Sequence, residues 1–273
     1  KRKPKYEAPK SGIFHLRLDP TNGEVLQQSF ARFSLERILQ WTTEDEYSQQ
    51  KEQATTYQAA LSLELGIPNI HMSRIIQRPD GAYTIITEQH RVKKIIPLPG
   101  LTRLASGDVD PMRRTDLERN MEFTSYDLLL TTFSAEGTLL WEQIIPHRSL
   151  YFDYNESWSG YALGFDGDHL HFIFNDQKVN QDTTSSENYA FYSTLELNKN
   201  LHTVHVQVDA DGNINRKTLA LRSEIEVDFR PNRFFQPDEQ TLIIEGARRP
   251  EDALFNLYQQ GYSTRFIRVL LHQ

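Results

Sequence analysis

The stretch that decides the fold is Tyr126–His147, which reads YDLLLTTFSAEGTLLWEQIIPH. Two apolar runs that favour β-strands, around Leu128 and around Trp141, flank a short polar segment ending in Gly137. A glycine can adopt the positive φ that a tight turn between two strands requires. The stretch therefore predicts a β-hairpin.

The same plan recurs along the chain. Three segments share the pattern apolar–x–apolar–Asp or Ser–spacer–Gly: LRLDPTNGEV at 16–25, TTFSAEGTLL at 131–140 and VQVDADGNIN at 206–215. Hairpins of a second type alternate with them, in the segments QRPDGAYTII, LGFDGDHLHF and FQPDEQTLII. Two successive hairpins make a four-stranded antiparallel meander, which is the unit of a β-propeller blade.

The expected fold class is all-β, a β-propeller-like array of four-stranded antiparallel blades with one short helical insertion. A basic linker at 1–12 precedes a propeller-like domain at 13–273. The domain divides into a partial blade at 13–30, a helical insertion at 34–60, blades at 61–147 and 161–221, and an incomplete blade at 232–273. Two packed β-sandwiches are the alternative. Because known propellers use about four to eight blades, this chain alone is not expected to close a ring.

The helical insertion has two start signals. Ser34 can cap a short helix that carries Leu35, Ile38 and Leu39. Thr43 and Glu46 fit a capping box that opens a second, very polar helix.

Composition narrows the function. The net charge of −7 argues against nucleic acid as a partner, because neutralising phosphates needs a basic surface. No apolar run reaches the roughly 20 residues that cross a bilayer, so membrane insertion by this segment is not expected. The absence of cysteine excludes disulfides, cysteine-ligated zinc and thiol nucleophiles. A start at Lys1 rather than at methionine indicates a portion of a longer protein.

Four segments carry a family resemblance: DGAYTIITEQH, YDLLLTTFSAEGTLLWEQIIPH, SGYALGFDGDHLHFIFNDQKVN and HVQVDADGNI. In this order they resemble β-propeller-like cell-envelope proteins of Bacteroidetes-type bacteria, over residues 61–225. Ser134 and Glu136 depart from that pattern, since Asp and Thr are common at these positions. The resemblance brings no catalytic residues with it.

The resemblance implies a non-enzymatic binding or scaffold module, a subunit or domain of a larger bacterial cell-envelope assembly with protein partners. It also implies an extracytoplasmic location, in the periplasm or at the outer-membrane surface. No cofactor is expected. The alternative is a glycan-binding or glycan-cleaving propeller enzyme. Such an enzyme needs a convergent pair of acids, or an arginine cluster with a tyrosine beside an acid, in a deep pocket.

Two segments could bind a metal, and neither is expected to. The run from Asp209 to Asn215 looks like a calcium loop, but its glycine is at the fourth position, which fits a hairpin turn better. His169 and His171 point the same way on one strand, and His202 and His205 come from another segment. Imidazoles at this spacing could bind zinc or copper, given a third ligand.

The least ordinary segment is Tyr151–Trp158, which interleaves aromatic with polar residues. We expect it on a connection between two blades, where partners dock. The partner-binding candidates are its four aromatic residues, Tyr151, Phe152, Tyr154 and Trp158. The alternative is that these rings pack between adjacent blades.

Overall fold

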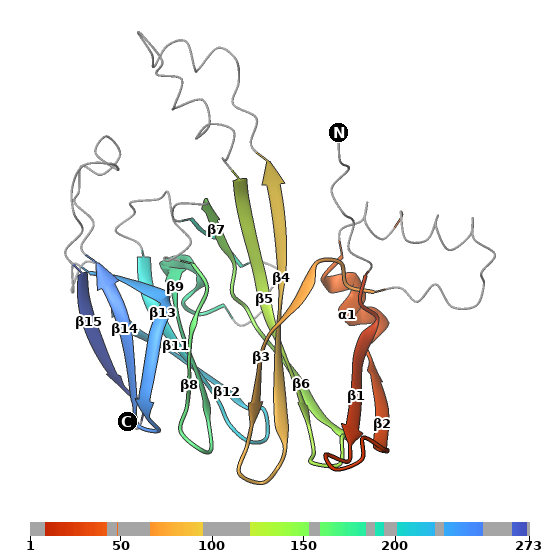
Figure 1. The fold of residues 1–273 in the computed structure, drawn as a ribbon. Coiled ribbons are helices and arrows are strands. Elements are labelled where there is room, and N and C mark those ends of the chain that lie inside the picture. The colour runs from red at the N-terminus through yellow and green to blue at the C-terminus, as the bar shows by residue number, and fades with distance from the viewer. Residues whose placement is uncertain are drawn as a thin grey trace, which may run out of the picture. The chain divides into compact units, whose positions relative to one another are not determined.

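The computed structural model describes residues 9–42, 48, 66–94, 121–152, 159–183, 189–193, 201–221, 227–247 and 264–271. Figure 1 shows that this part of the chain is built mainly from β-strands, which confirms the all-β expectation. The strands are β1 (Gly12–Leu18), β2 (Val25–Arg32), β3 (Ile70–Gln77), β4 (Tyr83–Lys94), β5 (Met121–Phe133), β6 (Leu139–Ile145), β7 (Ser149–Phe152), β8 (Ala162–Phe165), β9 (Leu170–Gln177), β10 (Tyr192–Ser193), β11 (Leu201–Val208), β12 (Ile214–Leu221), β13 (Asp228–Asp238), β14 (Thr241–Ala247) and β15 (Thr264–Leu270). The helices that lie wholly within these ranges are α1 (Leu35–Gln40) and the 3-10 helix η2 (Lys178–Asn180).

The strands form four sheets. β1 pairs with β2, and a six-stranded sheet has the order β10-β7-β5-β4-β3 with β6 also paired to β5. A four-stranded sheet has the order β12-β11-β9-β8, and a three-stranded sheet the order β13-β14-β15. The pairs β1–β2, β3–β4, β8–β9, β9–β11 and β11–β12 are antiparallel. The sheets are therefore antiparallel apart from the short parallel pair β7–β10, and their arrangement as propeller blades remains a prediction.

The hairpin predicted at Tyr126–His147 is present as β5 and β6. The backbone N–H of Ser134 donates to the carbonyl oxygen of Thr138 over 2.8 Å, which closes the turn. Gly137 has a φ of 77°, the left-handed conformation that the sequence predicted for it. The three leucines Leu128–Leu130 are fully buried. The hairpins predicted at β1–β2, β3–β4, β8–β9 and β11–β12 are also confirmed.

The chain divides into two compact units. The first unit comprises Lys1–His90 and Leu128–Ile144, and the second comprises Arg91–Asp127 and Ile145–Gln273. The long strands β4 and β5 contribute residues to both units.

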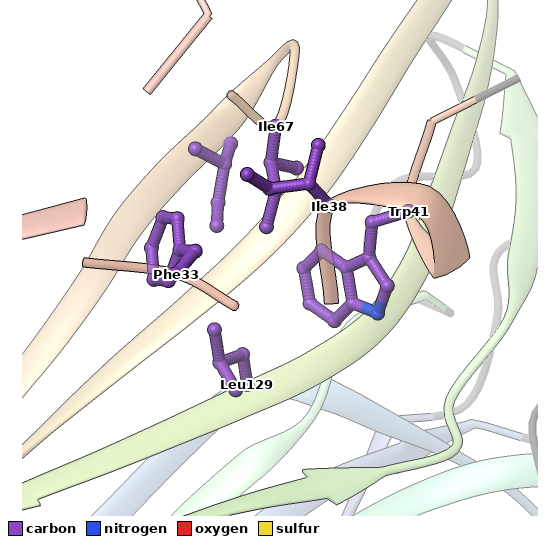
Figure 2. Packing of buried hydrophobic residues seen from close by; sticks show 6 residues of the cluster. Phe33, Ile38, Trp41, Ile67 and Leu129 are labelled. Atoms are coloured by element: carbon purple, nitrogen blue, oxygen red, sulfur yellow. The ribbon is translucent and has the colours of Figure 1, made fainter. Parts of the chain in front are cut away.

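The core of the first unit surrounds the short helix α1. Ser34 caps this helix as predicted, because its side-chain oxygen accepts a hydrogen bond from the backbone N–H of Arg37 over 3.1 Å. Figure 2 shows the indole of Trp41 and the side chain of Ile38 beside Leu129. The buried members of this cluster are Phe33, Ile38, Trp41, Ile67, Ile70 and Leu129. Of the second helix predicted from Thr43, the structure describes Ser48 alone, and Ser48 is helical.

The second unit has a separate core formed by strands of two sheets. Its buried members are Ala162, Ile173, Phe229, Leu242, Ile244 and Leu271. A hydrogen bond also links the two sheets: the side-chain amide of Asn175 in β9 donates to the carbonyl oxygen of Phe229 over 2.8 Å. This bond joins β9 to β13.

None of the described helices is long and apolar enough to cross a membrane.

Candidate functional site

Of the four aromatic residues singled out as partner-binding candidates, the structure describes the side chain of one. Tyr151 lies in strand β7, opposite Phe123 of β5. Tyr151 is 8% exposed, and its ring stacks on that of Phe123 with centroids 5.2 Å apart and planes 10° apart. Tyr151 is therefore part of the internal packing of the second unit. The side chain of Phe152, and all of Tyr154 and Trp158, lie outside the described residues.

A cluster of titratable side chains lies at the turn between β8 and β9. The carboxylate oxygen Oδ2 of Asp166 is 3.2 Å from Nδ1 of His169 and 3.0 Å from Nε2 of His171. The ligand atoms of these three residues all lie within 4.8 Å of one another. A fourth residue extends the cluster from β11, because Nδ1 of His171 is 2.9 Å from Nε2 of His205. We call Asp166, His169 and His171 the Asp–His–His cluster.

The hairpin turn itself orients the Asp166 carboxylate. Its other oxygen, Oδ1, accepts hydrogen bonds from the backbone N–H groups of Asp168, over 2.9 Å, and of His169, over 2.6 Å. An aspartate at a turn often bonds the local backbone in this way. Because Oδ1 is held by the backbone, Oδ2 is directed at the two imidazoles.

The surroundings give Asp166 and His205 different charges at neutral pH. Burial raises the pKa of Asp166, but hydrogen bonds from the backbone of His169, from the side chain of His171 and from the backbone of Asp168 outweigh it and lower the pKa to about 2. Burial lowers the pKa of His205 to about 4, and the nearby His171 and Lys217 act in the same direction. At neutral pH a carboxylate therefore stands at one end of the chain Asp166–His171–His205, and a neutral imidazole at the other.

His202 does not join this cluster, although the sequence grouped it with His205. Its Nε2 is 3.9 Å from Oδ2 of Asp176, in a different network. The Asp176 carboxylate accepts a hydrogen bond from the hydroxyl of Tyr189 over 2.5 Å and one from the guanidinium of Arg216. Burial lowers the pKa of His202, and raises that of Tyr189 well above its ordinary value.

This second network combines an acid and a tyrosine with one described arginine, Arg216, whereas a glycan-cleaving enzyme was expected to need a cluster of arginines. Asp176 is only 1% exposed, and Tyr189 is 3% exposed. A tyrosine that is to attack a sugar must reach its substrate. The burial of Asp176 and Tyr189 therefore favours a structural role for the network.

The loop at Asp209 is a hairpin turn, as the sequence predicted. The Oδ1 atom of Asp209 accepts hydrogen bonds from the backbone N–H groups of Asp211 and Asn213, over 2.9 and 2.8 Å. Its Oδ2 accepts one from the side-chain amide of Asn213 over 2.8 Å. Both oxygens are thus used within the turn.

An apolar groove of about 400 Å³ lies in the first unit. Residues of β1 and β3 supply most of its apolar walls: Ile13, Phe14, Leu16, Ile70, Met72 and Ile75. Several of these side chains are exposed, with Phe14 at 60% and Met72 at 62%. Alternation of apolar residues along 13–18 predicted a strand, but no sequence signal indicated that this face stays open.

Tyr83 is one of the polar residues that line the groove. Its ring stacks between those of His15 and Phe133, with both centroid distances at 5.4 Å. Its hydroxyl oxygen is buried and has no hydrogen-bond partner among the described residues. Burial raises the pKa of Tyr83, so the hydroxyl keeps its proton at neutral pH.

Comparison with models of protein families, with curated proteins and with solved structures finds no match to this chain.

Proposed function

We propose that the protein is a non-enzymatic binding module, and that the groove of its first unit holds an extended, largely apolar segment of a partner protein. The observation that carries the proposal is the groove itself, with its exposed Phe14 and Met72. A volume of about 400 Å³ suits a segment of a few residues. Contiguous exposed apolar surface on a soluble protein commonly marks an interaction site.

The position of the walls favours an extended segment. β3 is the last strand in the order of its sheet, and β1 belongs to a sheet of two strands. An extended peptide can add beside such a strand, and its alternate side chains then enter the apolar space.

The charges of the lining favour binding over catalysis. Lys10, His15, Tyr83 and Thr87 are the polar side chains among the described residues of the groove, and none of them is acidic. Acid–base catalysis on a glycan needs paired carboxyl groups. The positive charge of Lys10 instead favours a partner segment that carries an acidic residue beside its apolar ones.

A defined set of labelled peptides tests the proposal. We expect a ten-residue peptide that alternates Val and Thr and ends in Glu to bind the 273-residue chain, measured by fluorescence polarisation. Met72→Asp should abolish binding by placing a charge in the apolar wall.

The matched control for Met72→Asp is Phe266→Asp, which places the same charge at an apolar residue that is 78% exposed in the second unit. This variant should bind the peptide as the wild type does. Equal binding by the Met72 and Phe266 variants, or no binding by the wild type, would show that the groove is not the site.

The proposal also includes the propeller arrangement of the sheets and the location of the protein. We infer that the sheet β12-β11-β9-β8 is one blade of a propeller, because its four strands lie side by side as two hairpins. The resemblance at 61–225 supports a place in an extracytoplasmic assembly of the bacterial envelope. An experimental structure of the assembled protein tests the blade: its sheet should stand radially around a central channel, and a face-to-face sandwich would contradict it.

A further inference from the structure

The Asp–His–His cluster has a geometry that the hairpin turn alone does not require. The turn uses Oδ1 of Asp166, whereas Oδ2 faces the nitrogens of His169 and His171 at 3.2 and 3.0 Å. The ligand atoms of a tetrahedral ion with bonds of about 2.0–2.1 Å lie roughly 3.3 Å apart. The two observed separations are therefore close to those of a metal's first shell.

We propose that Asp166, His169 and His171 bind a divalent transition-metal ion of the zinc class. Two imidazole nitrogens and one carboxylate oxygen suit such an ion, whereas calcium and magnesium prefer shells made of oxygen alone. Three protein ligands leave a fourth position of a tetrahedral ion for a water molecule or for a group from a partner.

The surroundings support ligation by the buried histidine. With the ion on Nε2 of His171, its proton is carried by Nδ1, which lies 2.9 Å from Nε2 of His205 and can donate to it. Metal-ligating histidines commonly donate their other N–H to a second residue that orients the ring. The rings of His171 and His205 are also nearly parallel, 10° apart, which holds His171 in place.

Exposure shows where the ion would enter. The side chains of His171 and Asp166 are 0% and 1% exposed, whereas that of His169 is 35% exposed. An ion would therefore reach the cluster from the side of His169 and rest on two buried ligands. The open coordination position would face the solvent on the same side.

The test is titration of the 273-residue chain with ZnCl₂ after treatment with EDTA, measured by calorimetry. We expect the Asp–His–His cluster to bind one Zn²⁺ ion per chain. The midpoint of thermal unfolding should be higher when Zn²⁺ is present. Asp166→Asn keeps an oxygen for the backbone N–H groups of the turn but replaces the ligand atom Oδ2 with an amide nitrogen. It should weaken binding by more than about 100-fold, because loss of an outer-shell partner alone costs about 10- to 100-fold.

Two further variants keep the test decisive. His169→Ala removes the partly exposed ligand, should fold normally, and should lose the same affinity and the same thermal shift. Asp80→Asn is the matched control. Asp80 also accepts a backbone hydrogen bond in a turn, the one between β3 and β4, but the donor there is Ala82 and not a histidine. It should bind Zn²⁺ as the wild type does. If the wild type does not bind Zn²⁺, or if His169→Ala binds it equally well, the cluster is a hydrogen-bonded turn and the proposal is wrong.

Discussion

The side-chain amide of Gln89 donates a hydrogen bond to the main-chain carbonyl oxygen of Trp41, 48 residues away in the sequence, over 2.9 Å. The same nitrogen donates to the carbonyl oxygen of Pro68 over 2.8 Å. Gln89 is 2% exposed, so water does not replace these bonds. One buried amide thus joins the end of α1, the segment before β3, and β4.

Replacing Gln89 with leucine should destabilise the first unit by about 2–4 kcal/mol. The change leaves two carbonyl oxygens without this donor, and each unsatisfied buried group costs about 1–3 kcal/mol. Urea denaturation measures the loss. Gln28→Leu is the control, because Gln28 is exposed on β2 and its replacement should stay within about 0.5 kcal/mol. Similar losses in the two variants would mean that the bonds from Gln89 contribute little.

Gly137→Ala should cost more stability than Gly23→Ala. The two glycines have nearly the same conformation, with φ values of 77° and 76°, so both substitutions carry a backbone strain of about 1–2 kcal/mol. A Cβ at Gly137 would lie 2.3 Å from Nδ1 of His15, whereas a Cβ at Gly23 would meet nothing within 4 Å.

The difference between these two variants isolates the close approach of His15 to the β5–β6 turn. We expect it to be about 1–3 kcal/mol, the usual cost of overpacking. Midpoints of urea denaturation provide the comparison. Equal midpoints for Gly137→Ala and Gly23→Ala would show that the His15 ring moves away at no cost.

Arg216→Met should destabilise the second unit by about 3–5 kcal/mol. It leaves the carboxylate of Asp176 buried with one charged partner fewer, and removing one member of a buried ion pair is strongly destabilising. Arg233→Met is the matched control, because Arg233 pairs with Glu245 while 57% of its side chain is exposed. An exposed pair contributes at most about 1 kcal/mol. Thermal unfolding of the two variants decides whether the Asp176 network is structural.

His202 should make the second unit less stable in mild acid. Burial lowers the pKa of its imidazole in the folded protein, and the nearby Arg216 and Lys178 act in the same direction against the attraction of Asp176. As the pH falls below the unfolded value of 6.5, the unfolded chain takes up a proton that the folded protein resists. The contribution of His202 is therefore complete above that pH and decreases below it.

Urea denaturation at pH 7.5 and at pH 5.5 measures this decrease. His202→Asn should remove part of the pH dependence, whereas the same substitution at the exposed His71 should leave it as in the wild type. If His202→Asn and the wild type lose the same stability between the two pH values, the imidazole of His202 is not responsible.

The hairpins could be predicted from the sequence because their signals are local. A strand alternates its side chains with a period of two residues, and the glycine of a turn stands next to the strands that it joins. Gly137 and the pairing of β5 with β6 follow from one stretch of 22 residues, Tyr126–His147. The cap of α1 is also a local signal, because Ser34 stands just before the apolar residues of that helix.

Which of these elements pack together depends on contacts between residues far apart in the chain, so only the tertiary structure decided it. The sequence grouped His202 with His205, but residues three apart on a strand face opposite sides, and the register of β11 on β9 sets His202 opposite Asp176. The same register brings His205 to His171, and the turn brings Asp166 to both histidines of the cluster. Local pattern determines the strands and turns, because backbone conformation responds to neighbouring residues. The site depends on register and packing, which only the assembled sheets determine.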